Sequence, residues 1–233
     1  MRKIAITDIH GCKTTFLALL DSLAFAQSDE LYLLGDYVDR GPDSKGVIDT
    51  IFDLKKNGYT VRCLRGNHEE LVLQAADNDF TGLERWLVGD GKKTMESFNV
   101  TQCSDIPREY LDFMRELPYF IETDGYILVH GGLDFSIPDP LSNTREMCWL
   151  RNWDWYHQVR YDWLGERTIL HGHTPMATHH IEDQFYMLEI GRCLDIDAGC
   201  VFAERRFTDR DGMGSLCAFD MSNRELKFQE YVE

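Results

Sequence analysis

The sequence predicts an α/β (α+β) protein in which two mixed β-sheets pack as a sandwich flanked by helices. Two observations carry this prediction. Between residues 4 and 66, short apolar runs rich in β-branched residues alternate with segments of helical periodicity, which is typical of a parallel α/β core. From residue 119 onward, strand-like runs dominate and favour antiparallel pairing. Because the sequence contains no linker and no internal repeat, we expect one domain spanning residues 1–233.

The elements follow from local patterns. The first half contains three predicted strands, 4–9, 31–35 and 59–66, separated by predicted helices at 14–25 and 44–58. Gly58 is the expected C-cap of the second helix. The middle carries helical periodicity over 69–76, 82–89 and 107–117. The remaining strands are predicted over 119–123, 126–132, 167–173, 192–199, 215–220 and 225–232, with Asp124-Gly125 as a hairpin turn.

Composition narrows the function classes. The formal net charge of -16 disfavours stable binding to nucleic acids and to anionic membrane surfaces. Apolar runs are too short for a signal peptide or a membrane span, so we expect a cytoplasmic protein. The seven cysteines are scattered without a CxxC pair, which argues against zinc fingers and disulfides. Composition does not indicate the oligomeric state.

Polar residues follow five of the predicted strands. Parallel strands direct their carboxyl ends to one crevice, and neighbouring glycines let the backbone turn there. The residues in question are Asp8, His10, Asp36, Asp39, Arg40, Asn67, His68, His130, His171 and His173. Aspartate, histidine and asparagine form a ligand set that suits manganese, iron or zinc, and they are numerous enough for two ions. Arginine is the natural bidentate partner of phosphate oxygens.

Five sequence blocks carry a family resemblance. They are DIHG (8–11), GDYVDRG (35–41), GNHE (66–69), HGG (130–132) and GHTP (172–175). In this order they resemble the phosphoprotein phosphatase family of dinuclear-metal phosphoesterases, which has the calcineurin-like metallophosphoesterase fold. The compact length is similar to that of small bacterial members of the bacteriophage lambda phosphatase type. WLVGDGKKT (86–94) is similar to a WLxNGG-type segment of those members.

The resemblance implies two divalent metal ions, most simply manganese, with iron, zinc or nickel as alternatives. It implies six ligands: Asp8, His10, Asp36, Asn67, His130 and His173. Asp36 would bridge the two ions. A hydroxide shared by the metals would attack phosphorus in line.

The resemblance also implies roles for catalytic and phosphate-binding residues. His68 would protonate the leaving oxygen, and Asp39 would orient it. Arg40, Asn67 and Arg151 would bind the phosphate, Arg151 because it follows a tryptophan in WLR.

Three functions follow from these residues. The main hypothesis is a phosphoprotein phosphatase acting on serine or threonine phosphate, and also on tyrosine phosphate or small phosphoesters. The alternative is a dinucleoside polyphosphate hydrolase, such as one acting on diadenosine tetraphosphate. The third is a non-catalytic binding protein, which the intact ligand set disfavours. Under the alternative, tryptophans between residues 149 and 163 would stack adenines, although core packing is their commoner role.

Several residues also have simpler interpretations. Asp39 and Arg40 could form a local ion pair, and Asn67 could cap the following helix. His171 is expected to be structural, Cys12 to be a packing residue, and His179 and His180 to lie on the surface.

Overall fold

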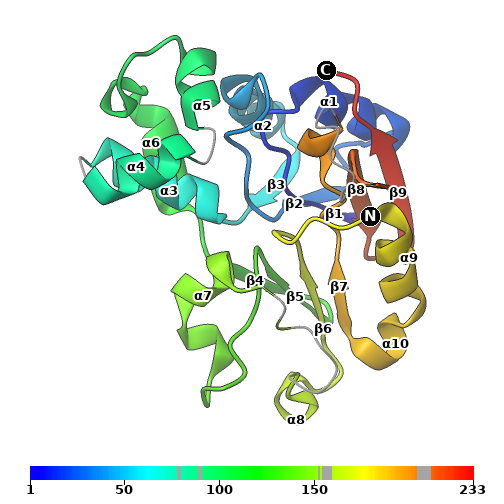
Figure 1. Cartoon of the computed structure of the whole chain (residues 1–233). Helices are drawn as coiled ribbons and strands as arrows, with labels where there is room; N and C mark the ends of the chain where they lie inside the picture. Colours follow the sequence, from blue (N-terminus) through cyan, green and yellow to red (C-terminus); the bar gives the residue numbers. More distant parts are fainter. Residues whose placement is uncertain (78–79, 89–90, 152, 154–158, 204–210) are drawn as a thin grey trace.

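The computed structural model describes residues 1–77, 80–88, 91–151, 153, 159–203 and 211–233. Two β-sheets form its centre, with helices outside them (Figure 1). One sheet has five strands in the order β3-β2-β1-β8-β9, and the other has four in the order β4-β5-β6-β7. Both sheets mix parallel and antiparallel pairs, so the predicted fold class is confirmed.

The five-stranded sheet combines a parallel part with an antiparallel edge. The parallel strands are β1 (Lys3–Ile6), β2 (Glu30–Leu33) and β3 (Thr60–Cys63). The antiparallel strands are β8 (Ser215–Asp220) and β9 (Glu225–Glu230). This sheet therefore joins the beginning of the chain to its last segment.

Helices connect and cover these strands. They are α1 (Lys13–Ser22), α2 (Ser44–Lys56), α3 (Asn67–Ala76), α4 (Phe80–Val88), α5 (Gly91–Phe98) and α6 (Arg108–Glu116). As expected, α2 ends next to Gly58, which has φ +83°. Helix α5, which is eight residues long, was not predicted. In the described part of the chain, no helix is long and apolar enough to cross a membrane.

The four-stranded sheet corrects one prediction. Its strands are β4 (Phe120–Thr123), β5 (Tyr126–Val129), β6 (Thr168–His171) and β7 (Cys193–Asp195). The β4–β5 hairpin is confirmed, but β5, β6 and β7 run parallel, so the prediction of an antiparallel second half is wrong for them. Long connections allow this crossover. They contain α7 (Thr144–Trp149), α8 (Tyr161–Leu164), α9 (Thr178–Tyr186) and α10 (Leu188–Gly191).

Successive residues of a strand point to opposite faces of its sheet, and both faces are buried in the sandwich. Ile4 and Ile6 point to a core beneath α1 and α2, whereas Ala5 points to a second core between the sheets. Leu128 joins that shared core from the other sheet, and Val129 packs on the outer face beside α7. The period of two is that of strands with both faces buried. Each sheet is thereby fixed against the other.

Candidate metal centre

The carboxyl ends of parallel strands from both sheets meet at one cluster of buried polar residues. The first sheet contributes Asp8 after β1, Asp36 after β2 and Asn67 after β3. The second contributes His130 after β5 and His173 after β6. Each of the five is at most 5% exposed. The crevice expected from the strand ends therefore lies between the two sheets.

Asp36 lies between two groups of donor atoms. Its Oδ2 is 3.4 Å from Nε2 of His10, and its Oδ1 is 3.4 Å from Nε2 of His130. That nitrogen of His130 is 3.1 Å from Oδ1 of Asn67 and 3.2 Å from Nδ1 of His173. A carboxylate with donors on both sides can bridge two cations.

The spacing of these donors fits metal ions. Donor atoms about 2.0–2.1 Å from one ion are roughly 3.0–3.4 Å apart at octahedral or tetrahedral angles. The separations among Asp36, His10, His130, Asn67 and His173 fall between 3.1 and 3.4 Å. Carboxylate, imidazole and amide donors suit divalent ions of the manganese-to-zinc series. The residues present therefore fit two divalent cations.

Asp8 is held by its second oxygen. Its Oδ2 accepts hydrogen bonds from Thr7 Oγ1 at 2.7 Å and from the backbone N–H of His173 at 3.0 Å. Its Oδ1 is 3.8 Å from Nε2 of His10. Burial, together with the Asp36 charge, raises the pKa of Asp8. One oxygen of Asp8 is thus positioned toward the donor group while the other ties the two sheets together.

Backbone carbonyls orient two of the imidazoles. Nδ1 of His10 is 2.8 Å from the carbonyl of Val38, and Nδ1 of His130 is 3.0 Å from the carbonyl of Leu34. A nitrogen facing a carbonyl carries the proton, which leaves Nε2 as the electron-pair donor. Burial and the nearby Arg40 guanidinium hold the pKa of His10 well below its usual value. His10 is therefore neutral, as a metal ligand must be.

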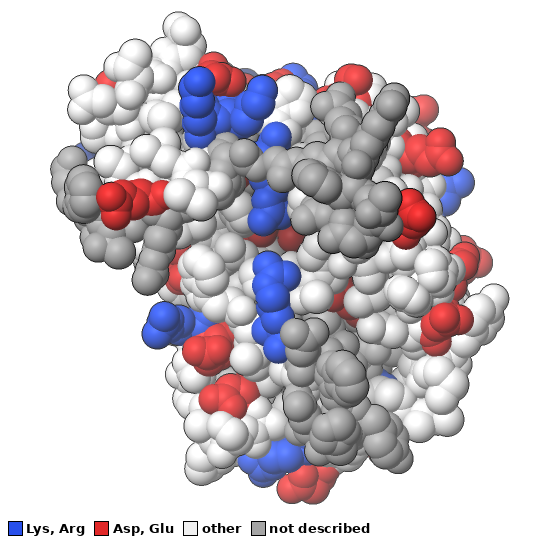
Figure 2. Space-filling model, viewed as in Figure 1, with Lys and Arg blue, Asp and Glu red and all other residues white. Residues whose placement is uncertain are grey.

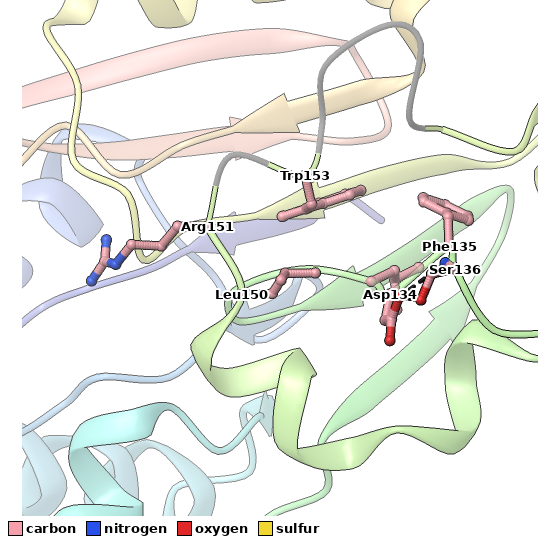
Figure 3. A pocket seen from close by; sticks show the side chains of 7 residues that line it. Asp134, Phe135, Ser136, Leu150, Arg151 and Trp153 are labelled. Carbon is pink, nitrogen blue, oxygen red and sulfur yellow. Dashed lines mark hydrogen bonds between the residues drawn. The ribbon is translucent and has the colours of Figure 1, made fainter.

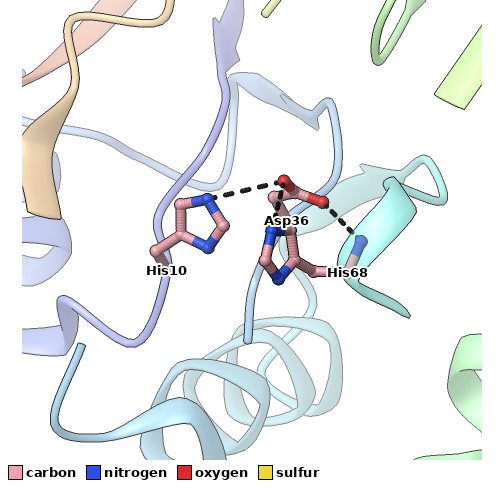
Figure 4. A group of neighbouring side chains, drawn as sticks. All are labelled: His10, Asp36 and His68. Atoms are coloured by element: carbon pink, nitrogen blue, oxygen red, sulfur yellow. Dashed lines mark hydrogen bonds and ion pairs between the residues drawn. The ribbon is translucent and has the colours of Figure 1, made fainter. Parts of the chain in front are cut away.

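His68 and Asp39 form a buried pair next to this cluster. Nδ1 of His68 is 2.7 Å from Oδ2 of Asp39, and Nε2 of His68 is 3.9 Å from Oδ2 of Asp36. Figure 4 shows the Asp36 carboxylate between His10 and His68. Burial alone would lower the pKa of His68, but the Asp36 charge and the Asp39 hydrogen bond outweigh it and raise the pKa. Spacing would also allow His68 as a ligand; the bond to Asp39 favours a protonated imidazole.

Asp39 is surrounded by donors and makes no ion pair with Arg40. Trp86 Nε1 donates to both of its carboxylate oxygens at 2.9 Å, and Thr94 Oγ1 donates to Oδ1 at 2.5 Å. Arg40 instead donates from Nη1 to Nε2 of His10 at 2.7 Å, and its guanidinium lies over the Phe202 ring at 5.5 Å. The local ion-pair interpretation is therefore wrong.

Two arginines lie at opposite donor groups. Arg40 contacts His10 in one group. Arg151 donates to the carbonyl of His173 in the other group and to Oγ1 of Thr174 at 3.4 Å. In the face of the molecule that Figure 2 shows, Lys and Arg side chains form a line down the middle. Despite the net charge of -16, the face over the centre therefore presents cations to an anionic ligand.

The backbone is strained at this site. Among the described residues, ten non-glycine residues have positive φ, and six of them are candidate site residues. These six are Asp8, His10, Asp36, Asp39, Arg40 and His173. Such conformations cost free energy and persist where the surroundings impose them, commonly at functional sites.

Two further buried acids lie beside the cluster: Asp197, which sequence reasoning missed, and Glu69, which it placed after a strand without a role. Asp197 follows β7 and is 4% exposed, and its pKa is raised well above the usual value by burial and by the charge of Asp8. Glu69 accepts backbone N–H groups of Asp36, Tyr37 and Gly66 at 2.8–2.9 Å, which fixes the turn after β2. The signal for Asp197 was present, because it follows a strand just as the other acids do.

The surroundings of five other polar or cysteine residues test their simpler interpretations. Asn67 is the first residue of α3 rather than its cap, since Gly66 occupies the N-cap position. His171 is buried, with Nδ1 3.6 Å from Asp195 and its ring 5.0 Å from that of Trp153. Cys12 is a buried packing residue. His179 and His180 are exposed, as predicted.

The tryptophans between residues 149 and 163 have separate surroundings. Trp149 Nε1 donates to Glu70 at 2.9 Å, and Trp163 packs against the Arg167 guanidinium at 4.6 Å. Trp153 lines a cavity beside Arg151. Trp155 and Tyr156 lie outside the described residues. The tryptophans therefore do not form one continuous platform in the described part of the segment.

Comparison of the sequence with known proteins finds a family and several relatives. A family model described as calcineurin-like phosphoesterase matches residues 1–200. A symmetrical bis(5'-nucleosyl)-tetraphosphatase of Nitrosomonas europaea is 40% identical over 134 residues, covering 57% of this chain and 45% of that protein. An asymmetrical bis(5'-nucleosyl)-tetraphosphatase of Bacillus velezensis is 24% identical over 236 residues, covering 86% and 85%. The match spans about half the length of most of the first curated relatives.

Solved structures share the fold. A crystal structure described as that of a candidate diadenosine tetraphosphatase superposes with a TM-score of 0.67 at 22% identity, covering 100% of this chain and 94% of that one. A protein serine/threonine phosphatase of Saccharomyces cerevisiae superposes with a TM-score of 0.65 at 18% identity, covering 100% and 81%. At these identities the likeness concerns the fold alone.

Proposed function

The chain belongs to the calcineurin-like phosphoesterase family, and from that membership we propose that it hydrolyses dinucleoside tetraphosphates, such as diadenosine tetraphosphate, between two phosphates. The observation that carries the proposal is the name shared by its curated relatives, which are bis(5'-nucleosyl)-tetraphosphatases. The phosphoprotein hypothesis rests on the sequence blocks, which the family shares across substrates. The relatives therefore favour the nucleotide alternative over the phosphoprotein one.

Six residues would hold two divalent cations at the centre. One group consists of Asp8, His10 and Asp36, and the other of Asp36, Asn67, His130 and His173. When bound, such ions lower the pKa of a coordinated water and neutralise charge on a phosphoryl group. The neutral state of His10 and the anionic state of Asp36, whose pKa is held low chiefly by the His130 and His68 imidazoles against the effect of burial, suit this role.

The two arginines would bind the phosphate chain. Arg40 reaches the His10 group, and Arg151 reaches the His173 group. Guanidinium groups bind phosphate oxygens in a bidentate manner and stay charged at all working pH values. A polyphosphate that spans the centre can therefore meet one arginine on each side of the phosphorus that is attacked. A substrate with a single phosphate group has no further phosphates on either side to contact both arginines.

His68 would donate a proton to the leaving oxygen. The Asp39 hydrogen bond at 2.7 Å fixes the ring, so that Nε2 faces the centre and carries the proton in the imidazolium form. A nucleoside diphosphate leaves more easily than an alkoxide, so it needs less help from an acid. The dependence on His68 should therefore increase as the leaving group becomes poorer.

A comparison of substrates tests this proposal. Purified protein is assayed with manganese, iron, zinc and nickel separately, on diadenosine tetraphosphate and on a serine-phosphorylated peptide. We expect kcat/KM for the tetraphosphate to exceed that for the peptide by at least tenfold. Faster turnover of the peptide would instead support the phosphoprotein hypothesis. Inactivity on both substrates and on p-nitrophenyl phosphate with every metal would support the non-catalytic one.

A further inference from the structure

A cavity of about 460 Å³ lies beside the metal centre. Its volume is within the range of small-molecule sites, roughly 300–1,000 Å³. Its lining comes from the loop after β5 and from the segment after α7 (Figure 3). The lining residues are Leu133, Asp134, Phe135, Ser136, Leu150, Arg151 and Trp153. Of these seven residues, only Arg151 has a role in the proposed reaction.

The aromatic wall of this cavity is rigid. Trp153 Nε1 donates to the carbonyl of Gly131 at 2.8 Å, and a Cβ at Gly132 would collide with the indole ring. The Phe135 ring lies 6.0 Å from Trp153 and 5.8 Å from Trp163. Leu150 adds an aliphatic surface. Fixed aromatic and aliphatic walls suit a flat heteroaromatic ring, since little side-chain entropy is lost on binding.

Arg151 joins the cavity to the metal centre. The residue lines the cavity, but its guanidinium donates to the carbonyl of His173 and points away from Phe135 and Trp153 (Figure 3). A ligand lying along this side chain would place its phosphate near His173 and its other end against the aromatic residues. The connection therefore fits a molecule with a phosphate at one end and a ring at the other.

The polar edge of the cavity carries the carboxylate of Asp134. Oδ1 of Asp134 accepts hydrogen bonds from the backbone N–H of Ser136 at 2.9 Å and from its hydroxyl at 2.5 Å. Oδ2 is 3.5 Å from Nδ2 of Asn143. This carboxylate repels phosphate oxygens and accepts hydrogen bonds from hydroxyl or amino groups. A nucleoside offers such donors on its ribose and, for adenine, on its exocyclic amine.

We propose that this cavity is a nucleoside subsite, in which the purine of one arm of the substrate packs against Phe135 and Trp153 while Arg151 holds the phosphate next to that arm. The assignment rests on the proposed function and deepens it. It identifies Phe135 as a residue that determines specificity for nucleotide substrates over base-free phosphoesters. A phosphopeptide side chain is the competing occupant, and the experiment below separates the two.

The test uses Phe135→Ala, with Tyr186→Ala as a control on the exposed side of α9. The readout is the ratio of kcat/KM for diadenosine tetraphosphate to that for an alkyl phosphate, which has no ring. Because a base stacked on an aromatic side chain loses that contact in the variant, Phe135→Ala should lower this ratio roughly tenfold. Tyr186→Ala should leave the ratio unchanged. An equal fall on both substrates, or no fall, would overturn the assignment.

A binding measurement keeps the result independent of the proposed reaction. Calorimetry gives the Kd of ADP and of inorganic pyrophosphate for the wild type, Phe135→Ala and the milder Phe135→Leu, each first checked by thermal unfolding. We expect weaker ADP binding in the order wild type, Leu, Ala, with pyrophosphate affected less. If the tetraphosphate is not a substrate but this order holds, the proposed function fails and the subsite stands. Equal ADP affinity in all three proteins, or a loss seen only with a phosphopeptide, would contradict the subsite.

Discussion

The indole Nε1 of Trp86 donates to both carboxylate oxygens of Asp39 at 2.9 Å, and Asp39 in turn holds Nδ1 of His68 at 2.7 Å. Trp86 is fully buried, and its ring packs against Gly91, where a side chain would collide with it. Thr94 on α5 adds a hydroxyl to the same carboxylate at 2.5 Å. The segment from α4 to α5 therefore supports the orientation of the His68 ring from behind.

Removal of the indole donor should slow the chemical step more than it weakens binding. Trp86→Phe keeps most of the volume but loses one hydrogen bond to a carboxylate, a loss of about 1.5–3 kcal/mol if it is fully expressed. We expect kcat to fall roughly tenfold or more, with KM changed less than threefold. Thr94→Ser, which keeps a hydroxyl, should stay near the wild type, whereas Thr94→Val should resemble Trp86→Phe. A rise in KM alone would point to a structural role.

The proposed acid role of His68 predicts a dependence on the leaving group. His68→Asn should keep both cations, because Asp36 and the other donors remain, yet it removes the proton donor. General acid catalysis commonly contributes about 10²–10⁴-fold, so turnover of an alkyl phosphate should fall by that order. Turnover of p-nitrophenyl phosphate, which has a better leaving group, should fall much less. Metal analysis of the variant provides the control, and equal losses on both substrates would contradict the acid role.

The proposed bridging role of Asp36 predicts that its substitution loses both metals. Asp36→Asn removes the carboxylate whose two oxygens each lie 3.4 Å from an imidazole Nε2, one of His10 and the other of His130. After dialysis against a buffer that contains only trace metal, elemental analysis should give fewer than about one ion per chain, compared with two for the wild type. Asp29→Asn is a matched control, since Asp29 is also buried but pairs with Arg2 far from the centre. Two tightly bound ions in Asp36→Asn would rule out the bridge.

The strand ends made much of this site predictable from the sequence. Asp8, Asp36 and Asn67 each follow an apolar run closely, and in a parallel sheet such residues share one edge. His130 and His173 obey the same rule in the second sheet. Their convergence with the first set depends on how the two sheets pack. The sequence blocks supplied that information through the family resemblance rather than through local patterns.

Other features depend on contacts that are distant along the chain. Trp86 and Asp39 are separated by 47 positions, and no periodicity indicates that they meet. The parallel order of β5, β6 and β7 was missed because α7 to α10 are short, at four to nine residues, and give weak helical signals. Asp197 follows a strand as the other acids do, but its place at the centre also depends on β7 running parallel to β6.

Metal removal should destabilise the folded protein as well as inactivate it. Asp8 and Asp36 are buried within one cluster. Asp197 lies close to them, and burial together with the charge of Asp8 raises the pKa of its carboxyl. Cations that bind only the native state relieve this repulsion and add RT ln(1 + [L]/Kd) to the free energy of unfolding. At a metal concentration of about 100 times Kd this is about 2.7 kcal/mol, or roughly 5–10 °C in Tm for a chain of this size.

Calorimetric scans with manganese and then with excess chelator should show this decrease in Tm. Asp36→Asn should show a much smaller one, because its centre cannot bridge two ions. An unchanged Tm in the wild type after verified metal removal would mean that the cations do not stabilise the native state, and equal shifts in both proteins would place the stabilising ions outside the cluster.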